Sequence, residues 1–162
     1  MTYLLDINGV MALLNRDHES HDPAHASFAR RPFATCPLIQ LGVLRLLTRP
    51  RLVKGKELPP LATPAEAWST LTVLRHNRAR VFLPDDLDAG ALKLPFRNIM
   101  GHRQWNDFYL AALSQKHGCV VATFDVGLQM AFPEIVKLIP SPTFATGEGF
   151  NYFSGPRVRN CQ

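Results

Sequence analysis

The sequence is poor in several features that mark particular classes of protein. It has 3 cysteines, an odd number with no close pairing, which argues against a disulfide framework and favours a reduced, intracellular protein. No apolar run is long enough to cross a bilayer, and the first residues lack the basic and apolar regions of a signal peptide. We therefore expect a cytoplasmic protein that is not held in a membrane.

A glycine-rich phosphate loop is also missing, which counts against a nucleotide-binding protein or a small-molecule phosphatase of the α/β class. The chain has 162 residues, of which 46% are hydrophobic and 19% charged, enough for one domain with a substantial core. Its formal net charge is +5. An excess of this sign favours a polyanionic partner such as nucleic acid.

Apolar segments of two lengths alternate along the chain. Short strands are expected at residues 3–6, 33–36, 80–83, 119–124 and 135–139, the last at a sheet edge. Helices are expected at residues 10–14, 22–28, 37–48, 63–76 and from 105 to about 117. Strands that alternate with helices predict an α/β protein with a parallel sheet covered on both faces.

Three segments lack such a pattern. Residues 49–60 are basic and flanked by proline, which predicts a loop, and residues 84–100 are expected to be irregular or to hold a short helix. From Ser141 onward the chain is rich in glycine and polar residues, which predicts a loosely ordered tail. We therefore expect one domain over residues 1–140 and a tail over residues 141–162.

Three aspartates stand where apolar segments give way to polar sequence. Asp6 ends the first strand pattern, Asp125 ends a later one, and Asp107 lies near the start of an amphipathic helix. Taken singly, each is also typical of a turn or a helix cap. Together they predict a crevice at the carboxyl edge of a parallel sheet, where open α/β folds bind their ligands. Carboxylates gathered there repel one another unless a hard cation such as Mg²⁺ or Mn²⁺ lies among them.

Short motifs in a fixed order surround these aspartates. They are Leu4-Leu5-Asp6-Ile7-Asn8, then Gly101-His102-Arg103-Gln104 before Asp107 and Tyr109-Leu110-Ala111-Ala112-Leu113, and then Ala122-Thr123-Phe124-Asp125. Weaker agreement comes from Thr63-Pro64-Ala65-Glu66-Ala67 and Phe82-Leu83-Pro84-Asp85-Asp86. In this order, over residues 1 to about 140, the motifs resemble the PIN-domain ribonucleases of the VapC toxin type. The resemblance implies a three-layer α/β/α sandwich, a Mg²⁺-dependent endoribonuclease acting on RNA, a cognate antitoxin and a homodimer.

Carried over from that family, the catalytic and metal-binding aspartates are Asp6, Asp107 and Asp125, and Asn8 supports the first of them. The family's glutamate falls at Gln40, which can form hydrogen bonds but cannot act as a base. This departure favours a second hypothesis, a catalytically weakened PIN-fold protein that binds RNA or antitoxin without efficient cleavage. It also predicts that Gln40→Glu lowers the metal-free melting temperature by adding one more negative charge.

Other polar clusters have simpler interpretations. Arg45, Arg49, Arg51 and Lys54 follow the Gln40 segment and form either a solvated basic face or a rim that binds RNA. The spacing of three histidines would suit zinc, but no cysteines match them, so we interpret His18, His21 and His25 as the solvated start of a helix. Asp85 and Asp86 are expected to form a turn and a helix cap.

Overall fold

The computed structural model of the chain describes residues 1–93, 99 and 101–140. The tail predicted from residue 141 onward lies outside these ranges. Five strands form one sheet in the order β5-β2-β1-β6-β7, and every neighbouring pair is parallel. They are β1 (Tyr3–Leu5), β2 (Phe33–Thr35), β5 (Arg80–Phe82), β6 (Val120–Thr123) and β7 (Val136–Leu138). The parallel sheet and the edge position of the last strand confirm the prediction from sequence.

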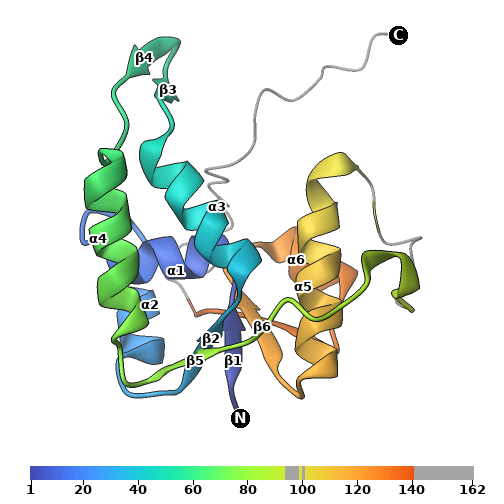
Figure 1. The fold of residues 1–162 in the computed structure, drawn as a ribbon. Coiled ribbons are helices and arrows are strands. Elements are labelled where there is room, and N and C mark those ends of the chain that lie inside the picture. The colour runs from blue at the N-terminus through green and yellow to red at the C-terminus, as the bar shows by residue number, and fades with distance from the viewer. Residues whose placement is uncertain (94–98, 100, 141–162) are drawn as a thin grey trace, which may run out of the picture.

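Helices cover both faces of this sheet (Figure 1). Four lie on one side: α1 (Ile7–Leu14), α2 (His21–Phe28), α3 (Pro37–Thr48) and α4 (Pro64–Arg75). Two lie on the other side: α5 (Trp105–Lys116) and α6 (Val126–Ala131). The predicted three-layer α/β/α sandwich is therefore confirmed.

Burial on both faces explains why the inner strands β1, β2 and β6 have mostly apolar sequences, whereas the edge strand β5 is largely exposed. Leu4, Leu5 and Val121 of the two central strands have no exposed surface, and Phe33 of β2 is nearly as buried. Phe108 on α5 is also fully buried. The core thus lies between the central strands and the helices that flank them.

The direction of the strand crossovers reverses between β1 and β6. From β1 the chain passes through α1 and α2 to β2 on one side, whereas from β6 it passes through α6 to β7 on the other. The elements that follow the two adjacent strands therefore diverge, and the carboxyl ends of such strands are where open α/β sheets form their ligand-binding crevice. This is the edge at which Asp6 and Asp125 stand.

Capping residues fix where several helices begin. Thr63 and Glu66 form a capping box at the start of α4, within the helix predicted over residues 63–76. Helix α1 begins at Ile7, earlier than predicted, because the Asp6 side chain caps it. Helix α2 begins at His21, directly after Ser20 and one residue before the predicted start.

The segment predicted as a basic loop instead contains a β-hairpin. Strands β3 (Arg51–Val53) and β4 (Lys56–Leu58) pair antiparallel and project beyond the end of α3 (Figure 1). Lys54 and Gly55 form the connection with φ of 49° and 78°, the positive values that suit a two-residue hairpin turn. The strands are short and lack the favoured Asn-Gly turn, so their sequence signal is weak.

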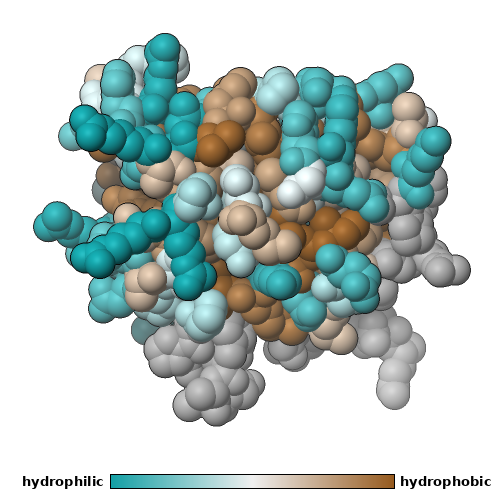
Figure 2. Space-filling model, turned by 90° about the horizontal axis from the view of Figure 1, so that it is seen from below, coloured by the Kyte–Doolittle hydropathy of each residue, from teal (hydrophilic) through white to brown (hydrophobic). Residues whose placement is uncertain are grey.

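The opposite end of the molecule, where the strands begin, has a mixed surface. Figure 2 shows hydrophilic side chains around this end, with hydrophobic patches between them. Within the described ranges, none of the helices has the length and apolar character needed to span a membrane.

Candidate active site

Asp6 occupies the crevice between β1 and β6 as a buried, fully bonded carboxylate. Its exposed fraction is 6%. Its Oδ1 accepts a hydrogen bond of 2.6 Å from the Gly9 amide, and its Oδ2 accepts one of 2.6 Å from the Thr123 hydroxyl. A Cβ on Gly9 would lie 3.1 Å from Asp6 Oδ1, so glycine leaves room for the carboxylate at that position. The carboxylate is thus held from both sides.

Thr123, the last residue of β6, links two of the predicted site aspartates. Its hydroxyl donates to Asp6 and accepts a 2.8 Å hydrogen bond from the backbone amide of Asp125. Asp125 caps α6, where its Oδ1 accepts a 3.1 Å bond from the Leu128 amide. Thr123 is fully buried, so its hydroxyl serves these two partners and no solvent. One side chain therefore fixes both strand ends relative to each other.

Asp107 joins the same crevice from the opposite layer. It lies in the first turn of α5, which runs antiparallel to β6, so the start of the helix comes to the carboxyl edge of the sheet. Burial raises the pKa of Asp107 to about 6, and the charge of Asp125 adds to this effect. Asp6, Asp107 and Asp125 span 119 positions of the sequence, from residue 6 to residue 125, and their charges act on one another in the folded chain.

The electrostatics of Asp6 reflect this gathering of like charges. Burial raises its pKa to about 7. Hydrogen bonds from Thr123 and Gly9 oppose that rise, whereas the charges of Asp107 and Asp125 add to it. A group in this environment gains from a cation nearby, because the cation offsets both the burial and the repulsion.

The donor set suits a hard divalent cation. Asp6, Asp107 and Asp125 offer only carboxylate oxygens, the ligands that Mg²⁺ and Mn²⁺ prefer, and each oxygen has more than one lone pair. As the side chains stand, no three His, Cys, Asp or Glu residues within the described ranges are grouped tightly enough to hold an ion. The residues thus fit such an ion by chemistry and charge, and their joint coordination of it stays a prediction.

Gln40 lies in the first half of α3 and faces a different polar group. Its Nε2 donates a 3.3 Å hydrogen bond to the Thr35 hydroxyl at the end of β2. The Arg80 guanidinium donates to the same oxygen at 3.1 Å. Among the described residues, no hydrogen bond joins Gln40 to any of the three aspartates. Gln40 therefore lies near the Arg80 guanidinium, a neighbour that we did not predict from the sequence.

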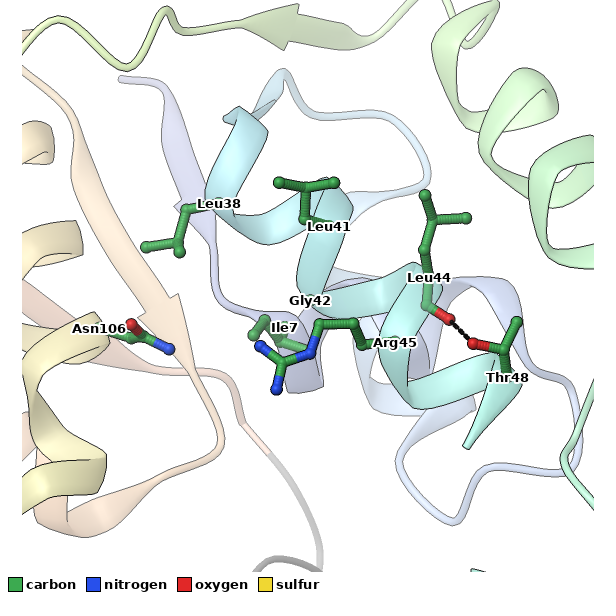
Figure 3. A pocket seen from close by; sticks show the side chains of 8 residues that line it. All are labelled: Ile7, Leu38, Leu41, Gly42, Leu44, Arg45, Thr48 and Asn106. Atoms are coloured by element: carbon green, nitrogen blue, oxygen red, sulfur yellow. Dashed lines mark hydrogen bonds between the residues drawn. The ribbon is translucent and has the colours of Figure 1, made fainter. Parts of the chain in front are cut away.

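The remaining predicted site residues lie in α1, in α3 and in the hairpin. Asn8 is half-buried in the first turn of α1. Arg45 is exposed on α3 and reaches toward the start of α5 (Figure 3). Arg49 ends α3, and Lys54 occupies the hairpin turn. Arg51 donates through Nε to the Pro59 carbonyl at 3.1 Å, so part of its guanidinium stabilises the hairpin.

Two other clusters differ from the prediction. His21 pairs through Nδ1 with the Ala12 carbonyl at 2.8 Å, and both it and His18 are half-buried, so this segment is less solvated than expected. The expected cap at Asp85 and Asp86 is wrong. Asp86 instead forms an ion pair of 3.1 Å with Lys116, and Asp88 caps the next short helix at Ala89–Ala91.

Sequence reasoning missed three residues of the polar network: Thr123, Thr35 and Arg80. Both threonines are the last residues of their strands, directly before the chain turns into the crevice or toward α3. A hydroxyl at the end of a buried strand is a usable signal, because it needs a partner there. Arg80 carries no comparable signal, since it opens a strand 45 positions after Thr35.

Comparison with protein families gives one match that spans most of the chain. Residues 3–131 match the PIN domain family. The sequence is also similar to Ribonuclease VapC29 of Mycobacterium tuberculosis, with 32% identity over 145 residues that cover 88% of this chain and 100% of that protein. It is 34% identical to Ribonuclease VapC38 of the same organism, over 77% of this chain and 86% of that one.

Solved structures agree at the level of the fold. The VapBC2 complex of Rickettsia felis bound to a promoter DNA fragment contains a chain with a TM-score of 0.58 and 14% identity, covering 85% of this chain and 98% of that one. The FitAB complex bound to a DNA fragment contains one with a TM-score of 0.57 and 18% identity, covering 85% and 94%.

Proposed function

Because this chain belongs to the PIN-domain family, among ribonucleases of the VapC type, we propose that it is an endoribonuclease toxin restrained by a cognate antitoxin protein. The activity of the similar VapC ribonucleases supports hydrolysis of RNA phosphodiester bonds. The similar VapBC and FitAB complexes support a toxin that works with a partner protein.

The observation that carries the proposal is the environment of Asp6. This buried carboxylate is held by Gly9 and Thr123, and the charges of Asp107 and Asp125 act on it. We propose that the three aspartates hold Mg²⁺, with Mn²⁺ as a substitute. When bound, the ion would neutralise phosphodiester charge and lower the pKa of a water molecule.

The protein's own groups divide the remaining work. Asp6 and Asp107 lie on opposite sides of the crevice and would fix the position of the ion. Asp125, whose amide bonds to Thr123, would orient the attacking water. Arg45 and the basic residues beyond it would bind RNA phosphates through attraction between opposite charges. Asn8, in the first turn of α1, would support the Asp6 side of the crevice.

A second candidate is a PIN-fold protein of weakened activity that acts mainly by binding RNA or antitoxin. The residue that favours it is Gln40, which the resemblance assigns to the position of the family's glutamate and which bonds to Thr35 beside Arg80. An amide cannot accept a proton as a carboxylate does. A cleavage rate that rises in Gln40→Glu would support this candidate.

We further propose that the protein works in the cytoplasm as a homodimer. Cys36 and Cys119 are free thiols, which suits a reducing compartment. Sedimentation of the purified chain, alone and with its antitoxin, tests both assemblies. A monomer that gains no mass with any protein encoded beside it would contradict this part of the proposal.

The function is tested by incubating the purified chain with total RNA in Mg²⁺, in Mn²⁺ and with a chelator. We expect discrete fragments with either metal and none with the chelator. The Asp6→Asn variant, purified in the same way, controls for contaminating nucleases. Fragments that persist in the chelator or in the variant would contradict the proposal, and so would intact RNA under every condition.

A further inference from the structure

Apart from Arg45, the residues that line a pocket near Asp6 and Asp107 have no role in the function proposed above. It lies between α3 and the start of α5 and has a volume of about 350 Å³ (Figure 3). Its floor is Ile7, the residue after Asp6, and its far wall is Asn106, the residue before Asp107. Two residues that line the pocket are therefore direct sequence neighbours of two of the three site aspartates.

The walls of this pocket combine apolar surface with one cation. Leu38, Leu41 and Gly42 of α3 supply the apolar side. Figure 3 shows the Arg45 side chain extended across the opening toward Asn106. Within the described ranges, Arg45 forms no ion pair with an acidic residue. Its charge is therefore available to a ligand.

Gly42 sets the depth of the pocket. A Cβ at this position would lie 2.9 Å from Cγ1 of Ile7, closer than packed side chains approach, so glycine is what lets α3 pack against the first residue of α1. The close approach places the wall carrying Arg45 beside the residue that follows Asp6. The pocket thus adjoins the start of α1, which the Asp6 side chain caps.

We propose that this pocket binds the nucleobase of the nucleotide that adjoins the scissile phosphate, with Arg45 on its phosphate and the Asn106 amide on the base edge. This inference rests on the proposed ribonuclease function. The size is at the lower end of the range for small-molecule sites, roughly 300–1,000 Å³, which suits one nucleotide unit. Apolar walls suit the faces of a base, and a single guanidinium suits one phosphate.

An antitoxin segment is the other ligand to consider. A peptide that neutralised the aspartates would bring basic side chains, which Arg45 would repel. A helix or strand of such a partner would also need an extended groove. RNA brings the opposite charge and a flat apolar group, so charge and shape both favour a nucleotide.

The test uses AMP, CMP, GMP and UMP as probes, with ribose 5-phosphate as the probe that lacks a base. Binding is measured by calorimetry and mapped by chemical-shift changes at Ile7 and Asn106. We expect at least one monophosphate to bind about tenfold more tightly than ribose 5-phosphate, because the base contacts the apolar walls. Equal binding of all five probes would overturn the proposal.

Matched variants separate the pocket from general charge and folding effects. Arg45→Ala should weaken the preferred monophosphate about tenfold, whereas Arg30→Ala, which removes an exposed charge after α2, should not. Leu41→Trp should fill the pocket and abolish binding, whereas Leu52→Trp on the hairpin should not; these leucines are 61% and 76% exposed. An unchanged affinity in Arg45→Ala or Leu41→Trp would overturn the proposal.

The pocket and the proposed function can fail separately. If the chain cleaves RNA but no monophosphate shifts the signals of Ile7 and Asn106, the pocket proposal is overturned and the function stands. If a monophosphate binds there but RNA stays intact, the nucleotide site stands and the function fails. If no monophosphate binds and the antitoxin shields Leu41→Cys from a thiol reagent, the pocket belongs to the partner and the proposal is overturned.

Discussion

The acidic crevice and the basic arm, defined as residues 45–58 of α3 and the hairpin, are built in opposite ways. In the crevice, Asp6 is 6% exposed and both its oxygens accept hydrogen bonds of 2.6 Å. In the arm, Leu52 is 76% exposed and Val53 is 46% exposed, and the side chains of Arg45, Lys54 and Lys56 are also exposed. The acidic carboxylate is thus buried and held in one orientation, whereas most charged side chains of the arm are exposed to solvent.

The difference shows how one chain separates two uses of charge. Burial raises the pKa values of Asp6 and Asp107 and costs stability, but it fixes their oxygens in the positions that the proposed chemistry needs. Exposed lysines and arginines cost little and hold no fixed geometry, which suits attraction of a flexible polyanion. Single substitutions in the crevice should therefore change cleavage and stability strongly. Substitutions in the arm should each change RNA affinity weakly, and their effects should add.

The largest expected effect is that of Asp6→Asn on cleavage. We expect the rate to fall by more than about 100-fold, since even residues that only support a metal ligand contribute about 10–100-fold. Metal-free stability should rise above about pH 7, because the variant buries no charge. Asp22→Asn, which changes an exposed carboxylate on α2, is the matched control. Equal rates for the two variants would place the chemistry elsewhere.

Thr123→Val should have the next largest effect. It keeps the shape of the side chain but removes the hydroxyl that joins Asp6 to the Asp125 amide. We expect about 10–100-fold slower cleavage and a loss of roughly 1–3 kcal/mol in the free energy of unfolding. Thr123→Ser should recover most of both quantities. If Thr123→Ser is as slow and as unstable as Thr123→Val, loss of the hydroxyl does not explain these two effects.

Neutralising the arm should change binding and leave chemistry intact. With Arg49, Arg51 and Lys54 all replaced by alanine, the slope of log affinity for RNA against log salt should flatten by up to about 2, since each phosphate contact contributes about 0.7. The maximal cleavage rate should stay near that of the wild type. A slope that does not change would show that the hairpin lies off the RNA path.

Gln40→Glu should have the smallest effect on stability. The sequence alone predicts a loss of stability, but the structure places Gln40 on the hydroxyl that also binds Arg80. A carboxylate there would face a partly exposed cation, so we expect the metal-free free energy of unfolding to change by about 0–1 kcal/mol in the stabilising direction. Arg80→Gln in the same background should remove the gain. A clear drop in melting temperature would instead indicate that a carboxylate at position 40 is repelled by the site aspartates.

The elements that carry the three aspartates could be predicted because each has a clear local sequence pattern. Asp6 and Asp125 follow buried strands directly, and the end of a parallel strand always lies at the same edge of the sheet. Asp107 could be added because its helix must run back against the strand that follows it. In each case a single short motif fixes both the element and the position of the carboxylate within it.

What could not be predicted depends on contacts between distant segments. Arg80 meets Gln40 through Thr35 only because β2 and β5 are neighbours in the sheet, which no local pattern states. The hairpin at residues 51–58 was missed because its strands are short, exposed and polar, so they carry no alternating apolar signal. The pocket beside Ile7 likewise depends on the packing of Gly42 against it.

The pKa values of the crevice predict how stability depends on pH. Asp6 and Asp107 hold pKa values of about 7 and about 6 in the folded chain, raised from 3.8. Between about pH 4 and 7 the folded state keeps protons that the unfolded state has released, so metal-free stability falls as pH rises. The loss should be on the order of a few kcal/mol in total.

The most direct test is the free energy of unfolding from about pH 4 to 8, measured with and without saturating Mg²⁺, for the wild type and Asp6→Asn. We predict that Mg²⁺ stabilises the wild type increasingly as pH rises through the pKa values of Asp6 and Asp107, because the ion binds the ionised carboxylates of the folded state. In Asp6→Asn the metal-free loss and the Mg²⁺ gain should both shrink. Stabilisation by Mg²⁺ that is the same in both proteins, or independent of pH, would contradict the assignment of this crevice as the metal site.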